Sequence, residues 1–174
     1  MALWAHTRAA KTLCLTKPLI ACLGFATATA ALATDNAEQA SIMPSTIGLH
    51  IGSKHSTPGF NDANPGVYGH WADASGNGWA LGTYLNSERA QSVWGGYSLS
   101  SPKLGLGSAG SRAFAASAGL TLGGVTGYRA AKLMPLILPS AALHMGNAAA
   151  RLTYLPKVEK RGAAALHLSL EYRF

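Results

Sequence analysis

The sequence predicts an all-β protein, an eight-stranded antiparallel β-barrel that spans a membrane. Short segments that alternate between apolar and polar residues recur along the chain after residue 33. No stretch of that part offers about 18 consecutive apolar residues free of proline and glycine-rich breaks, so no transmembrane helix is expected. Backbone groups in hydrocarbon must all find hydrogen-bond partners, and strands achieve this only in a closed barrel.

The first 33 residues are predicted to be a secretory signal peptide. The first 17 residues carry three basic residues and no acidic residue, and residues 18–32 are apolar with small side chains. Ala31-Leu32-Ala33 then offers a cleavage site of the A-x-A type. We therefore expect cleavage after Ala33 and one domain over residues 34–174. A retained membrane anchor and a lipoprotein acylated at Cys22 are the alternatives, although the apolar run is short for either.

The composition excludes several classes of protein. The chain has 174 residues, of which 48% are hydrophobic and 12% are charged, the opposite of the balance that keeps a segment disordered. It contains no long run of like charge, so no nucleic-acid partner is expected. Both cysteines, Cys14 and Cys22, precede Ala33, so the processed chain has no disulfide. With no further cysteine and scattered histidines, neither a metal site nor a cofactor is expected.

The C-terminal segment shows the clearest strand pattern. Between Leu166 and Phe174 every second residue is leucine or aromatic, and the residues between them are polar or charged. Successive side chains of a strand point to opposite sides, so one face is apolar and the other polar. In a membrane barrel the apolar face meets lipid and the polar face lines the lumen. An exported soluble β-sandwich or a lipocalin-like barrel is the alternative.

Eight segments of the processed chain are predicted strands. Turn-rich pieces such as residues 73–78, 87–91 and 157–162 separate several of them. Eight strands of about ten residues fit the available length and leave room for short turns at one end and longer loops at the other. The predicted strands cover residues 46–52, 66–72, 79–86, 93–99, 112–128, 135–145, 148–155 and 164–174.

Several segments, taken in order, match the pattern of a known family. They are residues 43–50 (MPSTIGLH), 61–66 (NDANPG), 79–87 (WALGTYLNS) and 92–97 (SVWGGY), followed by 120–127 (LTLGGVTG), 136–139 (LILP) and 152–156 (LTYLP). This ordered set, which extends over nearly all of residues 43–174, resembles the PagP family of outer-membrane lipid A palmitoyltransferases. In that family the first strand follows a proline and carries a histidine, as at Pro44 and His50, and a later strand ends in Asp-Ser.

The resemblance implies a monomeric enzyme of the outer membrane whose partners are phospholipid and lipid A. It would move an acyl chain from the phospholipid to a hydroxyl-linked acyl group on lipid A. The family's sensitive histidine and its Asp-Ser pair correspond here to His50, Asn86 and Ser87. A histidine near a serine suits acyl transfer, because imidazole can move a proton while a carbonyl is attacked. Asn86 can orient the imidazole but carries no charge, and the same change in a serine-protease triad costs orders of magnitude in rate.

Four prolines and one small residue complete the resemblance. Pro139 and Pro156 fall at the ends of neighbouring apolar strands, and Pro44 and Pro65 flank the first two strands. Proline cannot donate to a strand ladder, and in the family such prolines lie beside gaps through which lipid reaches the lumen. Interior glycines, among them Gly48 and Gly82, would leave room for an acyl chain. Ser98 stands where the family has a glycine at the pocket floor, which implies an acyl chain shorter than palmitoyl.

Three functions stay open on the sequence alone. They are the lipid A acyltransferase, a non-catalytic outer-membrane barrel for lipid binding or surface interaction, and a lipid A deacylase on a similar barrel. Asn86 favours the second, whereas the ordered prolines and the glycines favour the first. His50 can also be a polar lumen residue, Asn86-Ser87 can simply open a turn, and His55, expected in a loop, competes with His50 for the catalytic role.

Overall fold

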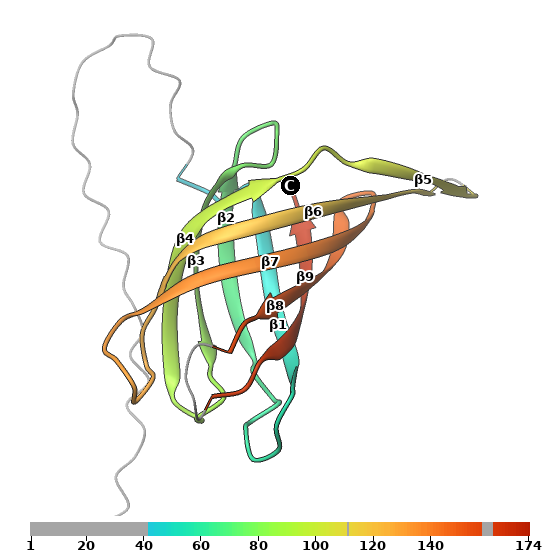
Figure 1. Cartoon of the computed structure of the whole chain (residues 1–174). Helices are drawn as coiled ribbons and strands as arrows, with labels where there is room; N and C mark the ends of the chain where they lie inside the picture. Colours follow the sequence, from blue (N-terminus) through green and yellow to red (C-terminus); the bar gives the residue numbers. More distant parts are fainter. Residues whose placement is uncertain (1–41, 111, 158–161) are drawn as a thin grey trace, which may run out of the picture. The chain divides into compact units, whose positions relative to one another are not determined.

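Nine β-strands make up the part of the chain that the structure describes (Figure 1). The structure is a computed structural model that describes residues 42–110, 112–157 and 162–174; the predicted signal peptide and its cleavage site lie outside them. Within these ranges no helix is long and apolar enough to cross a membrane. The strands are β1 (Thr46–His55), β2 (Gly66–Ala72), β3 (Gly78–Leu85), β4 (Gln91–Ser100), β5 (Leu104–Ala109), β6 (Arg112–Val125), β7 (Met134–Met145), β8 (Ala148–Leu155) and β9 (Ala165–Arg173).

Eight of these strands close into an antiparallel barrel. The strands follow one another in the order β4-β3-β2-β1-β9-β8-β7-β6-β5, and β4 also pairs with β6. This last pairing, from Trp94↔Val125 to Ser100↔Gly119, joins the two sides of the sheet into a ring. The predicted fold, an eight-stranded antiparallel barrel, is therefore confirmed, and all eight predicted segments form strands.

The ninth strand, β5, was not among the predicted segments. It pairs with the first part of β6 and forms with it a hairpin that projects from the barrel (Figure 1). All six residues of β5 are exposed, so no burial pattern marks it in the sequence. Leu104 and Leu106 do alternate with Gly105 and Gly107, but such a short, glycine-rich segment carries a weak strand signal.

The side chains of the barrel alternate between lumen and exterior. On β9, His167 and Ser169 are buried in the lumen, whereas Leu168 and Leu170 are exposed. β1 pairs with β9 with Leu49 opposite Leu170, so the outward-facing leucines of the two strands lie side by side. The alternation that the sequence shows is therefore the alternation between the two faces of the barrel wall.

The two ends of the barrel differ in their connections (Figure 1). One end carries the start of β1, the end of β9, the turns of residues 73–77 and 146–147, and the projecting hairpin; we call it the terminus end. The other end carries the loops of residues 56–65, 86–90 and 126–133 and the connection from β8 to β9; we call it the loop end. Short turns at the end where the first strand begins and the last strand ends, with longer loops opposite, are typical of outer-membrane barrels.

Two aromatic side chains fill the middle of the lumen. Tyr68 and Trp94 are both buried, and their ring centroids lie 5.6 Å apart. A Cβ atom on Gly48 would overlap the Tyr68 ring, and a Cβ on Gly82 would lie 2.7 Å from Nε1 of Trp94. These two glycines therefore make room for aromatic rings, rather than for the acyl chain that the sequence analysis expected there.

A charged pair crosses the lumen beside these rings. Arg151 donates from Nε to Oε1 of Glu171 (2.5 Å) and from Nη2 to Oε2 (3.1 Å). The Tyr68 hydroxyl also donates to Glu171 Oε1 (2.5 Å), and Arg151 Nη1 donates to Ser140 Oγ (3.0 Å). Charges inside a protein are tolerated when they are paired and hydrogen-bonded in this way. The network joins β2, β7, β8 and β9 across the lumen.

Gly48→Ala is expected to destabilise the barrel by about 1–3 kcal/mol, because the added methyl group overpacks against the Tyr68 ring. Urea unfolding of the protein in detergent micelles measures the change. Gly105→Ala on the projecting strand is the control, since a Cβ there meets no atom within 4 Å. If Gly48→Ala unfolds at the same urea concentration as the parent protein, Tyr68 does not occupy this space.

Candidate functional site

The barrel wall has a gap between β7 and β8 at the loop end. β7 pairs with β6 along its whole length, from Phe114↔Met145 to Val125↔Met134. Its ladder with β8 starts at Met145↔Ala148 and ends at Ser140↔Thr153, so the loop-end half of β7 extends beyond the ladder. Pro135 and Pro139 lie in that half. Proline has no backbone N–H group. Because the ladder with β6 runs through both prolines, we infer that the N–H groups they lack would have pointed toward β8.

The four predicted prolines occupy different places. Pro139 lies inside β7, at the first position beyond the β8 ladder, and Pro156 follows β8 and lines the cavity behind the gap. Pro65 precedes β2, and its carbonyl accepts a hydrogen bond from the N–H of Leu85 (3.0 Å), which extends the β2–β3 pairing. Pro44 precedes β1 at the terminus end. Two of the four therefore border the gap.

Two cavities meet behind the gap. One occupies the lumen, and the other lies at the loop end against the inward side chains of β7 and against Pro156. Leu136 and Leu138 line both cavities, and so do His55 and Ser87. An apolar route therefore leads from the gap to a hydroxyl and an imidazole group.

His50, the predicted catalytic histidine, uses both ring nitrogens inside the lumen. Its Nδ1 lies 2.6 Å from Nε2 of His167, and Nε1 of Trp94 lies 3.2 Å from its Nε2. The indole N–H can only donate, so Nε2 of a neutral His50 accepts and Nδ1 carries the proton. His167 then accepts at Nε2 and donates from Nδ1 to Oγ of Ser53, 2.8 Å away. In this series of hydrogen bonds every donor points toward Ser53. Neither histidine therefore offers an unprotonated nitrogen to a serine hydroxyl.

Asn86, the predicted orienting residue, is fully buried and holds two loops together. Its Oδ1 accepts hydrogen bonds from the N–H groups of Glu88 (2.8 Å) and Ala90 (2.9 Å). Its Nδ2 donates to Oγ of Ser92 (3.0 Å) and to the carbonyl of Gly127 (2.8 Å). These four bonds use the whole capacity of the amide. The role of Asn86 in orienting an imidazole stays a prediction.

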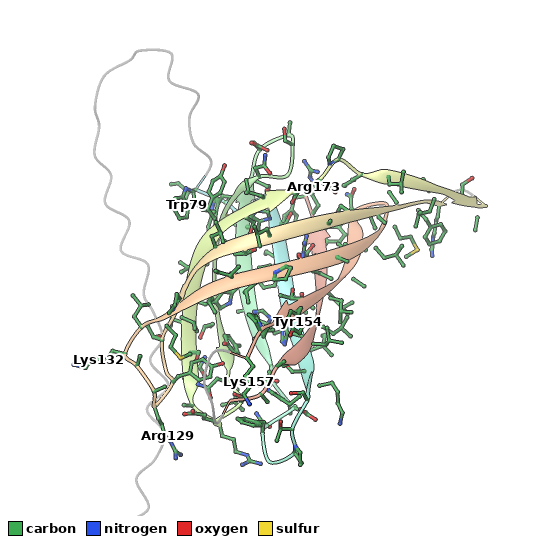
Figure 2. All side chains as sticks on the ribbon, in the orientation of Figure 1. Trp79, Arg129, Lys132, Tyr154, Lys157 and Arg173 are labelled. Carbon is green, nitrogen blue, oxygen red and sulfur yellow. The ribbon has the colours of Figure 1, made fainter. Side chains whose placement is uncertain are left out.

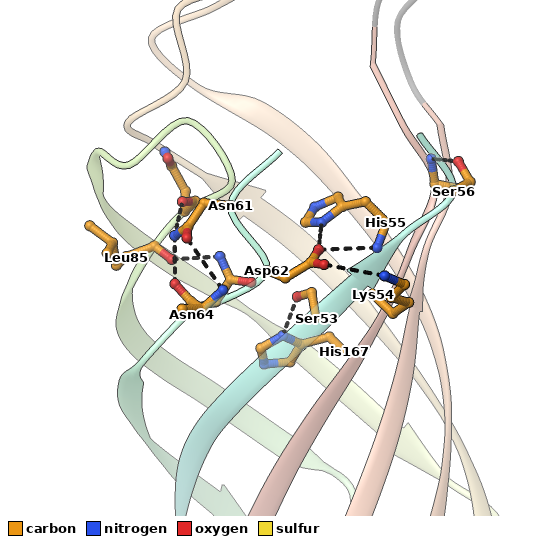
Figure 3. Close-up of polar contacts among 12 residues, drawn as sticks. Ser53, Lys54, His55, Ser56, Asn61, Asp62, Asn64, Leu85 and His167 are labelled. Carbon is orange, nitrogen blue, oxygen red and sulfur yellow. Dashed lines mark hydrogen bonds and ion pairs between the residues drawn. The ribbon is translucent and has the colours of Figure 1, made fainter. Parts of the chain in front are cut away.

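His55 forms the histidine–carboxylate pair of the loop end (Figure 3). Its Nδ1 lies 2.6 Å from Oδ1 of Asp62, and its own backbone N–H donates to the same oxygen (3.3 Å). Lys54 Nζ lies 3.6 Å from Oδ2 of Asp62. The hydrogen bond from His55 is the main cause that holds the pKa of the Asp62 carboxyl below its ordinary value, and the charge of Lys54 adds to it. Asp62 is therefore ionised at neutral pH.

Ser87 and Asn64 complete the loop-end site. Ser87 lines the cavity together with His55, and its carbonyl accepts a hydrogen bond from the N–H of Asn61 (2.9 Å). Asn64 is buried and donates from Nδ2 to the carbonyl of Leu85 (2.9 Å) (Figure 3). Its Oδ1 is also buried and has no hydrogen-bond partner among the described residues. Asn64 also lines the lumen cavity.

Ser98, the predicted pocket floor, lines the lumen cavity from β4. Its hydroxyl lies 2.7 Å from Oγ1 of Thr121 on β6. Ser98 comes two inward positions after Trp94 along β4, on the side of the terminus end. The lumen cavity extends past the aromatic rings to reach it.

The sequence analysis missed Asp62 as the partner of a histidine. The two residues lie seven positions apart, a spacing that no regular element would bring together. The loop of residues 56–65 folds back along β1, where the carbonyl of Asp62 accepts the N–H of Ser53 (2.8 Å). The one signal in the sequence was an acidic residue in the loop directly after a histidine at a strand end.

Comparison with known proteins leaves the site to be interpreted from its geometry. No protein-family model matches the chain, and no curated protein matches it. Over the described residues, no group of three or more His, Cys, Asp or Glu side chains is arranged to hold a metal ion.

Asn86→Asp is expected to destabilise the protein by about 1–3 kcal/mol, because a carboxylate oxygen would face the carbonyl of Gly127 in place of a donor. Thermal unfolding in detergent measures the change. Asn77→Asp is the matched control, because Oδ1 of Asn77 accepts the N–H of Ser100 (2.8 Å) and an aspartate keeps that bond. Equal melting temperatures for the two variants would contradict the bonding assigned to Asn86.

Proposed function

We propose that the chain is an outer-membrane acyltransferase that moves an acyl chain from a phospholipid to lipid A. One observation carries the proposal: the gap beside Pro139 opens onto an apolar route that ends at Ser87 and His55. A lipid tail requires an apolar path, and acyl transfer requires a hydroxyl group with a base beside it. The loop end supplies both in one cavity.

The exterior of the barrel supports a location in the membrane. Soluble monomers rarely expose apolar patches larger than a few hundred Å². Here every strand of the barrel exposes a large apolar side chain on its outer face. These residues are Leu49, Val67, Leu81, Val93, Leu122, Ile137, Leu152 and Leu168.

The two ends of the barrel suit the two surfaces of an outer membrane. Near the terminus end, Trp79 packs edge-on against Tyr97 with ring centroids 5.4 Å apart, as in the aromatic girdles of membrane barrels. Arg129, Lys132 and Lys157 all lie toward the opposite, loop end of the barrel (Figure 2). Exposed cations at that end complement the phosphate groups of lipid A.

A second candidate, a non-catalytic lipid-binding barrel, is favoured by one observation. The position where the resembled family has an aspartate holds Asn86, which carries no charge and whose hydrogen bonds all go to loops and strand ends. In this alternative the gap and the cavity admit a lipid tail without transferring it.

The test is to produce the protein in a Gram-negative host that lacks its own lipid A palmitoyltransferase and to determine the mass of the lipid A. A gain of one acyl group is expected, and Ser98 predicts a chain shorter than palmitoyl. Ser87→Ala should abolish the gain. A loss of one acyl group would indicate a deacylase instead. An unchanged mass, with the barrel folded in the outer membrane, would favour the binding protein.

Closing the gap should block the transfer. Cysteines introduced at Leu138 and Leu155, which line both cavities, can be joined by a reducible thiol crosslinker, since the processed chain is expected to have no cysteine of its own. The gain in lipid A mass should disappear on crosslinking and return on reduction. The control pair is Ala141→Cys with Leu152→Cys, which are partners in the intact part of the β7–β8 ladder. Undiminished transfer with the first pair joined would rule out this route.

A further inference from the structure

We propose that Ser87, His55 and Asp62 form the acyl-transfer site, in place of an arrangement centred on His50 and Asn86. In this site Ser87 is the nucleophile, His55 transfers the proton, and Asp62 is a positioning residue. The inference rests on the proposed function and names the groups that perform it. The substrate is a long-chain ester that reaches the site through the gap beside β7.

The orientation of the His55 ring is fixed by its surroundings. An ionised carboxylate can only accept, so a neutral His55 carries its ring proton on Nδ1, toward Asp62, and has its lone pair on Nε2. The ring of Phe60 stacks on the imidazole with centroids 5.2 Å apart and planes 21° apart. The His55 side chain is 9% exposed, against 46% for Asp62. His55 therefore presents a basic nitrogen from a held, largely buried ring.

Ser87 lies next to the loop that carries Asp62. The N–H of Asn61 donates to the carbonyl of Ser87 (2.9 Å), and Asp62 is the following residue. Ser87 and His55 line both the lumen cavity and the cavity behind the gap. Ser87 and His55 therefore border the same space, in which we place the acyl ester.

His50 lacks the property that makes His55 suitable. Its Nε2 accepts from the donor-only indole of Trp94, and its Nδ1 bonds to His167. The serine at the end of this chain of hydrogen bonds is Ser53, and the His167 Nδ1 that faces it carries a proton. A base must instead offer a lone pair to the hydroxyl that it activates.

Asn64 lines the lumen cavity and has one buried acceptor without a partner among the described residues. Its Nδ2 faces the carbonyl of Leu85, which fixes the orientation of the amide, and Oδ1 is left buried without a partner among the described residues. A buried acceptor without a hydrogen bond costs free energy until a donor reaches it.

The reaction follows from these roles. Ser87 Oγ attacks the ester carbonyl carbon of the phospholipid while its proton passes to Nε2 of His55. The bond from that carbon to the glycerol oxygen breaks and the proton moves to this oxygen, which leaves acyl-Ser87 and a lysophospholipid. A hydroxyl group of lipid A then attacks the acyl carbon, its proton passes through His55 to Ser87 Oγ, and the free serine is restored.

The test measures release of lysophospholipid by the processed full chain in detergent micelles that contain a diacyl phospholipid, with water as the acceptor. Ser87→Ala and His55→Gln should each lower kcat by about 10²–10⁴-fold. Asp62→Asn keeps an acceptor for His55 but removes the charge, so kcat should fall about tenfold or more with KM unchanged, and Asp62→Glu should restore part of it. The acyl group should be found on Ser87 by mass spectrometry.

Two histidine variants serve as comparisons. His144→Gln, on β7 near the terminus end, should keep release within a few-fold of the parent, with folding checked by thermal unfolding. The second variant is His50→Gln: release that is lost there and kept in His55→Gln would overturn the assignment in favour of His50. Release that persists in His55→Gln, or that is absent from the parent protein, would overturn the assignment. Failure of the proposed function looks different, because lysophospholipid would then be released while the mass of lipid A in the host stays unchanged.

Discussion

The structure depends on the requirement that each strand of a closed barrel has a hydrogen-bonded neighbour on both sides. The ring from β1 to β9, closed by β4 and β6, meets this requirement nearly everywhere along the described strands. Two strands depart from it at the loop end: the half of β7 that contains the prolines extends beyond the ladder with β8, and residues 51–55 of β1 extend beyond the ladder with β2. On β7, proline thus interrupts the pairing with β8 and leaves the ladder with β6 intact on the other side.

The side chains of the lumen determine which groups lie behind the gap in the wall. Tyr68 and Trp94 fill the middle of the lumen, and the pair of Arg151 and Glu171 spans it nearer the terminus end. The apolar side chains Leu136 and Leu138 line the side behind the gap. Apolar side chains and polar groups therefore meet at the loop end, where the histidine–carboxylate pair lies.

The parts of the fold that depend on the alternation of apolar and polar residues could be predicted from the sequence. Contacts that depend on the conformation of a loop could not. The strand from Leu166 to Phe174 was evident because each outward residue is apolar. β5 was not predicted because a fully exposed strand leaves no such pattern in the sequence. The pairing of His55 with Asp62 depends on how one loop folds back, which no local spacing encodes. Likewise, Gly48 indicated free space, but Tyr68, 20 positions further on, occupies it.

The opening in the wall lies beside the loops, at the level where lipid head groups meet water if the barrel sits upright in a bilayer. A lipid that used it could slide one tail inward while its charged head stayed hydrated outside. The large free energy of dragging an ionic group through hydrocarbon would then never arise. A two-tailed lipid would keep its second tail in the bilayer, so the barrel would handle tails singly without extracting whole molecules.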